Sequence, residues 1–91
     1  MIDSGITDEM KKKYVERRHA DLAALDQALI EKDYQTMSNL GHQLKGNAST
    51  FSFDDLAAIA VALETASHAK DEKSARTSIN AIRTWLARRS K

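Results

Sequence analysis

Apolar residues recur along the chain at intervals of three and four, and polar residues occupy most of the positions between them. This spacing predicts amphipathic helices, and no stretch shows the sustained alternation that is typical of a half-buried strand. The first helix is expected to begin after Thr7, because a hydroxyl side chain can cap a helix and the acidic Asp8 and Glu9 suit its first turn. Its core positions form one stripe, interrupted at Arg18: Met10, Tyr14, Val15, Leu22, Leu25 and Leu29.

Two further stripes follow, separated by a short connection. Asp33 can cap a second helix, whose core positions are Tyr34, Met37, Leu40, Leu44, Ala48 and Phe51. Residues 52–54 connect it to a third helix, with Ser52 or Asp54 as the expected cap. The third helix is expected to end near Lys70, and its core positions are Leu56, Ile59, Ala60 and Leu63.

A fourth helix is expected to open at Asp71. Trp85 lies on the flank of its stripe, whose core positions are Ala75, Ile79, Ile82 and Leu86. Connections this short favour antiparallel neighbours. The sequence therefore predicts an all-α fold, an up-down antiparallel four-helix bundle that residues 1–91 form as a single domain.

The composition agrees with a small helical domain and excludes several classes of protein. The chain has 91 residues, of which 42% are hydrophobic, and it contains no proline and no cysteine. Proline is the costliest residue in a helix interior, so its absence favours helix. Without cysteine, disulfides and thiolate metal sites are impossible. The apolar runs are too short to span a membrane and the N-terminus does not resemble a signal peptide, so a cytoplasmic location without a membrane partner is expected.

The formal net charge is only +1, but positive charge is concentrated toward the C-terminal end. Residues 71–91 contain six Lys and Arg residues against two Asp and Glu residues. Cations near the end of a helix complement its backbone dipole, which explains Arg88 and Arg89 without a ligand. A helical module that binds nucleic acid through these arginines stays an alternative. Such proteins usually carry a strong overall positive charge, so no nucleic-acid partner is expected.

Two of the three glycines, Gly41 and Gly46, lie inside the second predicted helix. Each costs about 1 kcal/mol relative to alanine in a helix interior, which suggests that the missing side chains serve a purpose. At about 100° per residue, Gly41 falls within the apolar stripe, where it would let a neighbouring helix approach closely. Gly46 falls on the other side of the helix, one turn from His42.

His42 projects about 140° from the centre of the apolar stripe and should face water. The residues one or two turns away on its side of the helix are small: Ser38, Asn39, Gly46 and Ser49. Lys45 is the one long side chain beside it, so the pattern indicates an imidazole that a bulky partner can reach. His19 and His68 have no such surroundings and are expected to be exposed or capping residues. Because the three histidines belong to different helices, no metal site is predicted.

Residues 40–51 read Leu-Gly-His-Gln-Leu-Lys-Gly-Asn-Ala-Ser-Thr-Phe. This segment resembles the signature of histidine-containing phosphotransfer (HPt) domains: histidine, any residue, an apolar residue, lysine, glycine, then small residues and an aromatic residue or leucine. The similarity continues through Phe53, Leu56 and the Leu63-Glu64 pair, and the four-helix layout covers nearly the whole chain. Ser52 departs from the pattern, because the family most often has glycine there, and serine is expected to serve as a cap instead.

The resemblance implies that His42 accepts a phosphoryl group at Nε2 from a phosphoaspartate of a receiver domain and passes it to another receiver in a two-component phosphorelay. It implies that Lys45 neutralises the phosphoryl oxygens and that Gly46 leaves space for the phosphate and the partner. Gln43 or another polar neighbour would orient the ring. The residues expected to contact the partner are Ser38, Asn39, Gln43 and Ser49.

The expected partners are receiver domains of response regulators or hybrid histidine kinases, and the chain itself is expected to be a monomer. No cofactor is expected on the chain, since Mg²⁺ would belong to the receiver. The sequence contains no glycine-rich loop that could cradle the phosphates of ATP, so a phosphocarrier rather than an enzyme is predicted. The alternative is a helical module that docks on a receiver or a kinase and carries no phosphate.

Overall fold

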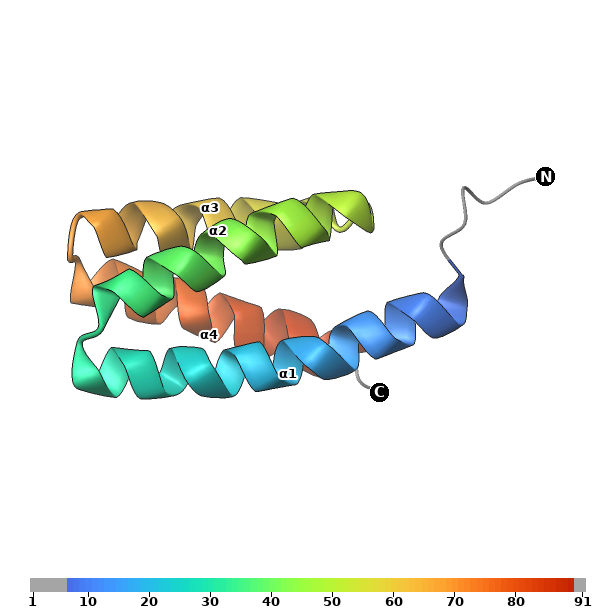
Figure 1. Cartoon of the computed structure of the whole chain (residues 1–91), viewed down its shortest axis with the longest axis horizontal. Helices are drawn as coiled ribbons and strands as arrows, with labels where there is room; N and C mark the ends of the chain where they lie inside the picture. Colours follow the sequence, from blue (N-terminus) through green and yellow to red (C-terminus); the bar gives the residue numbers. More distant parts are fainter. Residues whose placement is uncertain (1–6, 90–91) are drawn as a thin grey trace.

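A computed structural model describes residues 7–89 of the chain. These residues form four helices in an up-down arrangement: α1 (Asp8–Glu31), α2 (Tyr34–Thr50), α3 (Asp54–His68) and α4 (Glu72–Arg89). Each helix packs against the next along the chain, and α1 also packs against α4, which closes the bundle (Figure 1). The predicted all-α four-helix bundle is therefore confirmed. Within residues 7–89, no helix combines the length and the apolar character that a membrane span needs.

The core is built from one face of each helix, as the predicted stripes indicate. The large side chains that are almost fully buried come from all four helices: Leu25, Met37, Leu56, Leu63, Ile79, Ile82 and Leu86. Trp85, expected on the flank of the last stripe, is 6% exposed and packs edge-on against Phe53. Met10, expected in the core, is 40% exposed. The reason is that the first turns of α1 extend past the ends of the neighbouring helices (Figure 1), and residues 7–13 are all exposed.

Arg18, which interrupts the stripe of α1, is accommodated at the edge of the core. Its guanidinium carbon lies 4.5 Å from the centroid of the Tyr14 ring, and its Nε lies 2.8 Å from Oδ2 of Asp21. The Tyr14 hydroxyl donates a hydrogen bond of 2.5 Å to Oδ1 of Asn47 on α2. Burial raises the pKa of Tyr14, while the neighbouring Arg18 opposes that shift.

The three connections between helices share one backbone arrangement. Within two residues of the helix ends, Lys32, Ser52 and Lys70 adopt left-handed conformations, with φ of 55°, 62° and 55°. In each case the next residue donates its N–H to a carbonyl five residues back, as in the Schellman motif. These bonds are Asp33 to Ala28 at 2.8 Å, Phe53 to Ala48 at 2.9 Å and Asp71 to Ala66 at 2.9 Å. The short turns therefore reverse the chain in the same way three times.

The residue that follows each left-handed position directly precedes the next helix, in the N-cap position. Asp33 and Asp71 each accept hydrogen bonds from the backbone N–H and the hydroxyl of the residue three positions on, Thr36 and Ser74. These hydrogen bonds favour the ionised carboxylates and hold the pKa of both aspartates below its ordinary value. The predicted cap at Asp33 and the predicted opening of the fourth helix at Asp71 are thus confirmed.

At the second connection the same position is occupied by Phe53, so the prediction that Ser52 or Asp54 caps α3 is wrong. The Phe53 side chain makes no capping hydrogen bond. Its ring is 6% exposed and lies between Tyr14 and Trp85, with centroid distances of 5.4 and 5.0 Å. Burial of an aromatic ring thus takes precedence over a side-chain cap at this position.

Replacing Ser52 with glycine is expected to raise the free energy of unfolding by about 0.5–1 kcal/mol. A left-handed conformation costs a residue with a Cβ about 1–2 kcal/mol, and the greater freedom of glycine in the unfolded chain offsets part of the gain. Urea denaturation measures the effect. Ser49→Gly is the matched control, because Ser49 is helical and its replacement should be destabilising by about 0.5 kcal/mol. Equal changes in the free energy of unfolding at both positions would show that the left-handed conformation of Ser52 carries no such cost.

Candidate functional site

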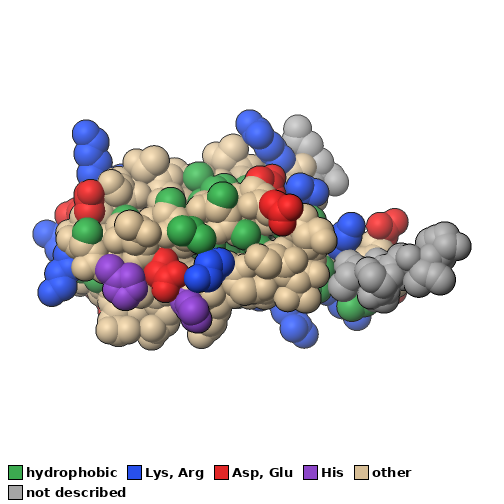
Figure 2. All heavy atoms as spheres, turned by 90° about the horizontal axis from the view of Figure 1, so that it is seen from above, with side chains coloured by type: hydrophobic (Ala, Val, Ile, Leu, Met, Phe, Trp, Pro, Cys, Tyr) green, Lys and Arg blue, Asp and Glu red, His purple; other side chains and the backbone are tan. Residues whose placement is uncertain are grey.

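Helix α2 presents His42 to solvent on the face that α2 and α3 form together. The His42 side chain is 68% exposed, as its angular position predicts. Figure 2 shows this face, on which histidine side chains gather beside an acidic and a basic group. The exposed imidazole is thus surrounded by other ionisable side chains.

Glu64 of α3 holds the central place among these side chains. Its Oε2 lies 3.4 Å from Nδ1 of His42, and its Oε1 lies 3.8 Å from Nζ of Lys45. The Glu64 side chain is 22% exposed, so the contacts are partly shielded from water. Because the two nitrogens of an imidazole point in different directions, a ring that faces the carboxylate with Nδ1 presents Nε2 away from it. Contacts of this length at a catalytic site often shorten when the reaction partner binds.

Gly41 sets the distance between the helices that carry this pair. A Cβ at Gly41 would lie 3.2 Å from the backbone nitrogen of Glu64 and 3.3 Å from the carbonyl oxygen of Ala60. Only a residue without a side chain allows α2 and α3 to approach this closely without a shift. The predicted packing role of Gly41 is confirmed, and the contact lies next to His42 in one helix and at Glu64 in the other.

Gly46 lies on the exposed side of α2, one turn from His42. A Cβ at this position would meet no atom within 4 Å. The surface around the imidazole is therefore open here, as the sequence predicts. Lys45 lies between the two, with 42% of its side chain exposed. The roles in steric access and in charge neutralisation that the family resemblance implies for Gly46 and Lys45 stay predictions.

A shallow hollow adjoins His42, and its lining residues come from α2 and α3: Gln35, Ser38, Asn39, His42, Gln43, Glu64 and His68. Among the residues expected to contact a partner, Asn39, Gln43 and Ser49 are exposed. Ser38 differs from them, because it is only 8% exposed and its Oγ lies 3.3 Å from Nε2 of His68. The neighbour found at Nδ1 of His42 is Glu64 from α3, rather than Gln43.

The structure adds two residues that sequence reasoning did not assign to the site, Glu64 and His68. The His68 side chain is 69% exposed, as predicted, but its Nε2 also lies 3.8 Å from Oε2 of Glu64. The two residues are four positions apart and therefore share one face of α3. The similarity of the Leu63-Glu64 pair to the family pattern was the available signal for Glu64. We refer to His42, Lys45, Glu64 and His68 as the His42 cluster.

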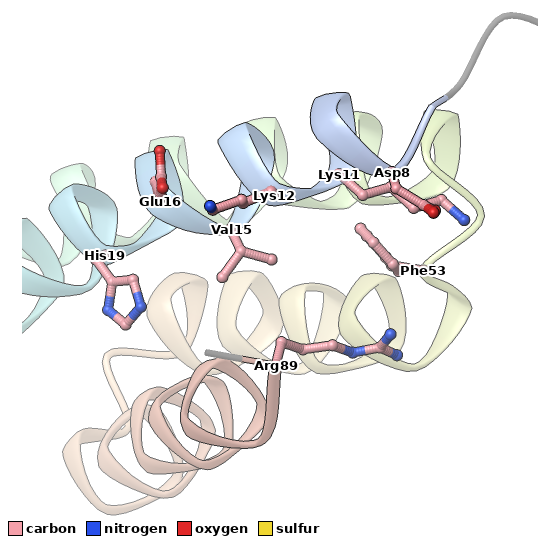
Figure 3. A pocket seen from close by; sticks show the side chains of 8 residues that line it. All are labelled: Asp8, Lys11, Lys12, Val15, Glu16, His19, Phe53 and Arg89. Atoms are coloured by element: carbon pink, nitrogen blue, oxygen red, sulfur yellow. The ribbon is translucent and has the colours of Figure 1, made fainter. Parts of the chain in front are cut away.

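A second hollow lies at the other end of the bundle, between the start of α1 and the end of α4 (Figure 3). Arg89 borders it, with its guanidinium carbon 4.9 Å from the ring centroid of Phe53 and 4.8 Å from that of Trp85. Its Nη2 also lies 3.9 Å from Oδ2 of Asp55. Arg89, one of the cations that suggested a nucleic-acid module, is thus engaged by the bundle itself. Across the part of the chain that the structure describes, no group of three His, Cys, Asp or Glu side chains is placed to hold a metal ion.

Comparison with known families identifies the chain. A search among curated proteins and a search among solved structures each gave no significant match. The profile of the Hpt domain family matches residues 9–90, which span all four helices and the His42 cluster. Domains of this family serve histidine phosphotransfer in two-component phosphorelays, where they interact with receiver domains and kinases. With nearly its whole length matched, the chain belongs to the Hpt domain family.

Proposed function

We propose that the chain is a phosphocarrier in which Nε2 of His42 accepts a phosphoryl group from the phosphoaspartate of one receiver domain and donates it to the aspartate of another. The observation that carries the proposal is the exposed His42 ring, whose Nδ1 faces Glu64 at 3.4 Å. A nucleophile that reacts inside another protein's active site must project from its own surface. His42 meets that requirement, and the close approach of α2 to α3 at Gly41 fixes the position of the helix that carries it.

In the proposed step, the lone pair of Nε2 attacks phosphorus and the P–O bond to the donor aspartate breaks. The aspartate leaves as a carboxylate, and the ring, which keeps its proton on Nδ1, gains positive charge. The carboxylate of Glu64 faces that nitrogen and stabilises the charge as it develops. Transfer to the acceptor aspartate reverses these events.

The transition state of phosphoryl transfer is loose and in-line, so positioning and charge neutralisation matter most. Lys45 places an ammonium group one turn from His42, where it would approach the phosphoryl oxygens. The Mg²⁺ and acidic residues that complete the site would come from the receiver. The open surface at Gly46 would admit the receiver's loops.

The test is to incubate the chain with phosphorylated receiver domains and to measure its intact mass. We expect a gain of one phosphoryl group that is lost in acid and kept in base, as is typical of a P–N bond. His42→Gln should show no gain, whereas His19→Gln on α1 should behave like the parent chain. An undiminished gain in His42→Gln would refute the assignment. Unchanged receiver affinity in His42→Ala, without phosphate on the parent chain, would instead indicate a docking module that carries no phosphate.

Lys45→Ala is expected to slow transfer by roughly tenfold to a hundredfold, because the phosphoryl oxygens lose a cation. The fold should hardly change, since the contact between Lys45 and Glu64 is partly exposed and such pairs contribute less than about 1 kcal/mol. Single-turnover transfer and urea denaturation measure the two effects. Lys73→Ala, on the exposed surface of α4, is the control. Loss of the fold with unchanged transfer in the folded fraction would contradict this role.

A further inference from the structure

We infer that His68 is a positioning residue for the reaction at His42: it holds the carboxylate of Glu64 in the orientation in which Oε2 faces Nδ1 of the reactive ring. This inference rests on the proposed function and extends it to a residue one turn beyond Glu64 on α3. His68 acts through Glu64 and does not itself touch the phosphoryl group.

One carboxylate oxygen of Glu64 lies near two imidazoles. Oε2 of Glu64 lies 3.4 Å from Nδ1 of His42 and 3.8 Å from Nε2 of His68. The second oxygen, Oε1, faces Lys45 at 3.8 Å. The rotamer of Glu64 thus depends on a balance between the ammonium group on one side and the two rings on the other.

His68 is itself anchored to α2. Its Nε2 lies 3.3 Å from Oγ of Ser38, which is 8% exposed and precedes His42 by one helical turn. Hydroxyl groups buried to this extent are normally hydrogen-bonded. His68 therefore connects the helix that carries Glu64 to the helix that carries His42, and its ring has a fixed neighbour on each.

The position of the proton on the His68 ring decides whether His68 can donate a hydrogen bond toward Glu64. A neutral imidazole carries one proton, on either Nδ1 or Nε2. With the proton on Nδ1, Nε2 could accept a hydrogen bond from the Ser38 hydroxyl, but its lone pair would also face the Glu64 carboxylate, which is unfavourable. With the proton on Nε2, the N–H faces both the carboxylate and the Ser38 oxygen. The geometry therefore favours His68 as a donor toward Oε2, which keeps that oxygen between the two rings.

Within the His42 cluster, loss of His68 leaves the His42 ring alone to balance the attraction of the Lys45 ammonium group for the carboxylate. The carboxylate would then turn toward the ammonium group, and Nδ1 of His42 would lose the acceptor that favours its proton. More of the His42 ring would carry its proton on Nε2, the nitrogen that must be free to attack phosphorus. Fewer molecules would then be ready to react.

The experiment compares the parent chain with His68→Ala and His68→Gln at pH 8, where ordinary imidazoles are mostly neutral. The ¹⁵N chemical shifts of the His42 ring report which nitrogen carries the proton. We expect the Nδ1–H form to dominate in the parent chain, to decline in His68→Ala and to recover in His68→Gln, whose amide N–H can also donate to Glu64. Ser38→Ala should shift the ratio in the same direction as His68→Ala, but less. The control His19→Ala should leave it unchanged.

A second readout uses phosphoramidate as a small donor, so no receiver is needed. Nε2 attacks phosphorus, the P–N bond of the donor breaks, and the donor nitrogen, which is already protonated as –NH3⁺, leaves as ammonia. His68→Ala should react about tenfold more slowly, less than the roughly hundredfold that misplacement of reacting atoms can cost, and His68→Gln should recover most of the rate. An unchanged proton distribution on His42 in His68→Ala would overturn the inference. If the parent chain accepts no phosphoryl group from phosphoramidate or from any phosphorylated receiver, the proposed function fails, and the ¹⁵N comparison alone then decides the link between the two histidines.

Discussion

Gly41→Leu is expected to lower the free energy of unfolding by about 2–3 kcal/mol, the range in which overpacking a tightly packed site falls. Even a Cβ at this position would lie 3.2 Å from the backbone nitrogen of Glu64, so a larger side chain must push α3 away from α2. The atoms it meets belong to a helix backbone, which cannot rotate aside as a side chain can. The displacement would open the interface on which the core of both helices depends.

Gly46→Leu is the matched control, because it makes the same replacement in the same helix at a position with no atom within 4 Å of a Cβ. Leucine is a better helix former than glycine by about 0.8 kcal/mol, so this variant should be more stable than the parent chain. Urea denaturation of both variants measures the contrast. Similar free energies of unfolding for the two would show that the close approach at Gly41 does not limit packing.

Gly46→Leu also tests whether Gly46 gives a large partner access to His42. Gly46→Leu should lose at least tenfold more in transfer from a phosphorylated receiver than in reaction with phosphoramidate. The new side chain occupies the surface on which the receiver must dock, and a displacement of about 1 Å can cost a hundredfold. Equal losses with both donors would contradict a role for Gly46 in admitting a large partner.

The helices could be read from the sequence because each buries one continuous stripe, and the period of such a stripe is a local property. The first turns of α1 show the limit of that reading. Met10 follows the helical period, yet it is 40% exposed, because burial also depends on how far the neighbouring helices extend. The cap of α3 shows a second limit. Local chemistry favours Ser52 or Asp54, but the backbone of the turn puts Phe53 in the cap position and the core retains its ring.

The candidate site, too, could be predicted from the sequence only in part. A projection of α2 alone places His42 outward and Gly41 inward, since both directions follow from one helix. It cannot show which residue of α3 lies opposite, because that depends on the rotation and height of one helix against another. Gly41 indicated a close approach, but only the structure shows that the approach occurs at Glu64. The contacts of Glu64 with His42 and His68 follow from that pairing and were not predictable from the spacing of residues.

Replacing Glu64 with alanine is expected to reduce transfer to His42 by about a hundredfold while leaving the bundle folded. Two effects combine: Nδ1 loses the acceptor that favours its proton, and the positive charge that develops on the ring is no longer neutralised. The fold should tolerate the change, because Glu64 lies at the surface edge and its three contacts are of 3.4 to 3.8 Å with partly exposed partners. Single-turnover transfer, with unfolding measured in urea, tests both parts.

Glu64→Gln distinguishes the two effects. The amide keeps the shape of the side chain and can still accept a hydrogen bond from Nδ1, but it carries no negative charge. An intermediate loss is therefore expected, with the ¹⁵N shifts of His42 near those of the parent chain and the rate well below it. Glu72→Gln, which removes a carboxylate that pairs with Arg76 and Lys32 at a distance from the cluster, should leave transfer unchanged. Transfer in Glu64→Gln at the parent rate would mean that the carboxylate only orients the ring, whereas a rate as low as that of Glu64→Ala would mean that its charge does most of the work.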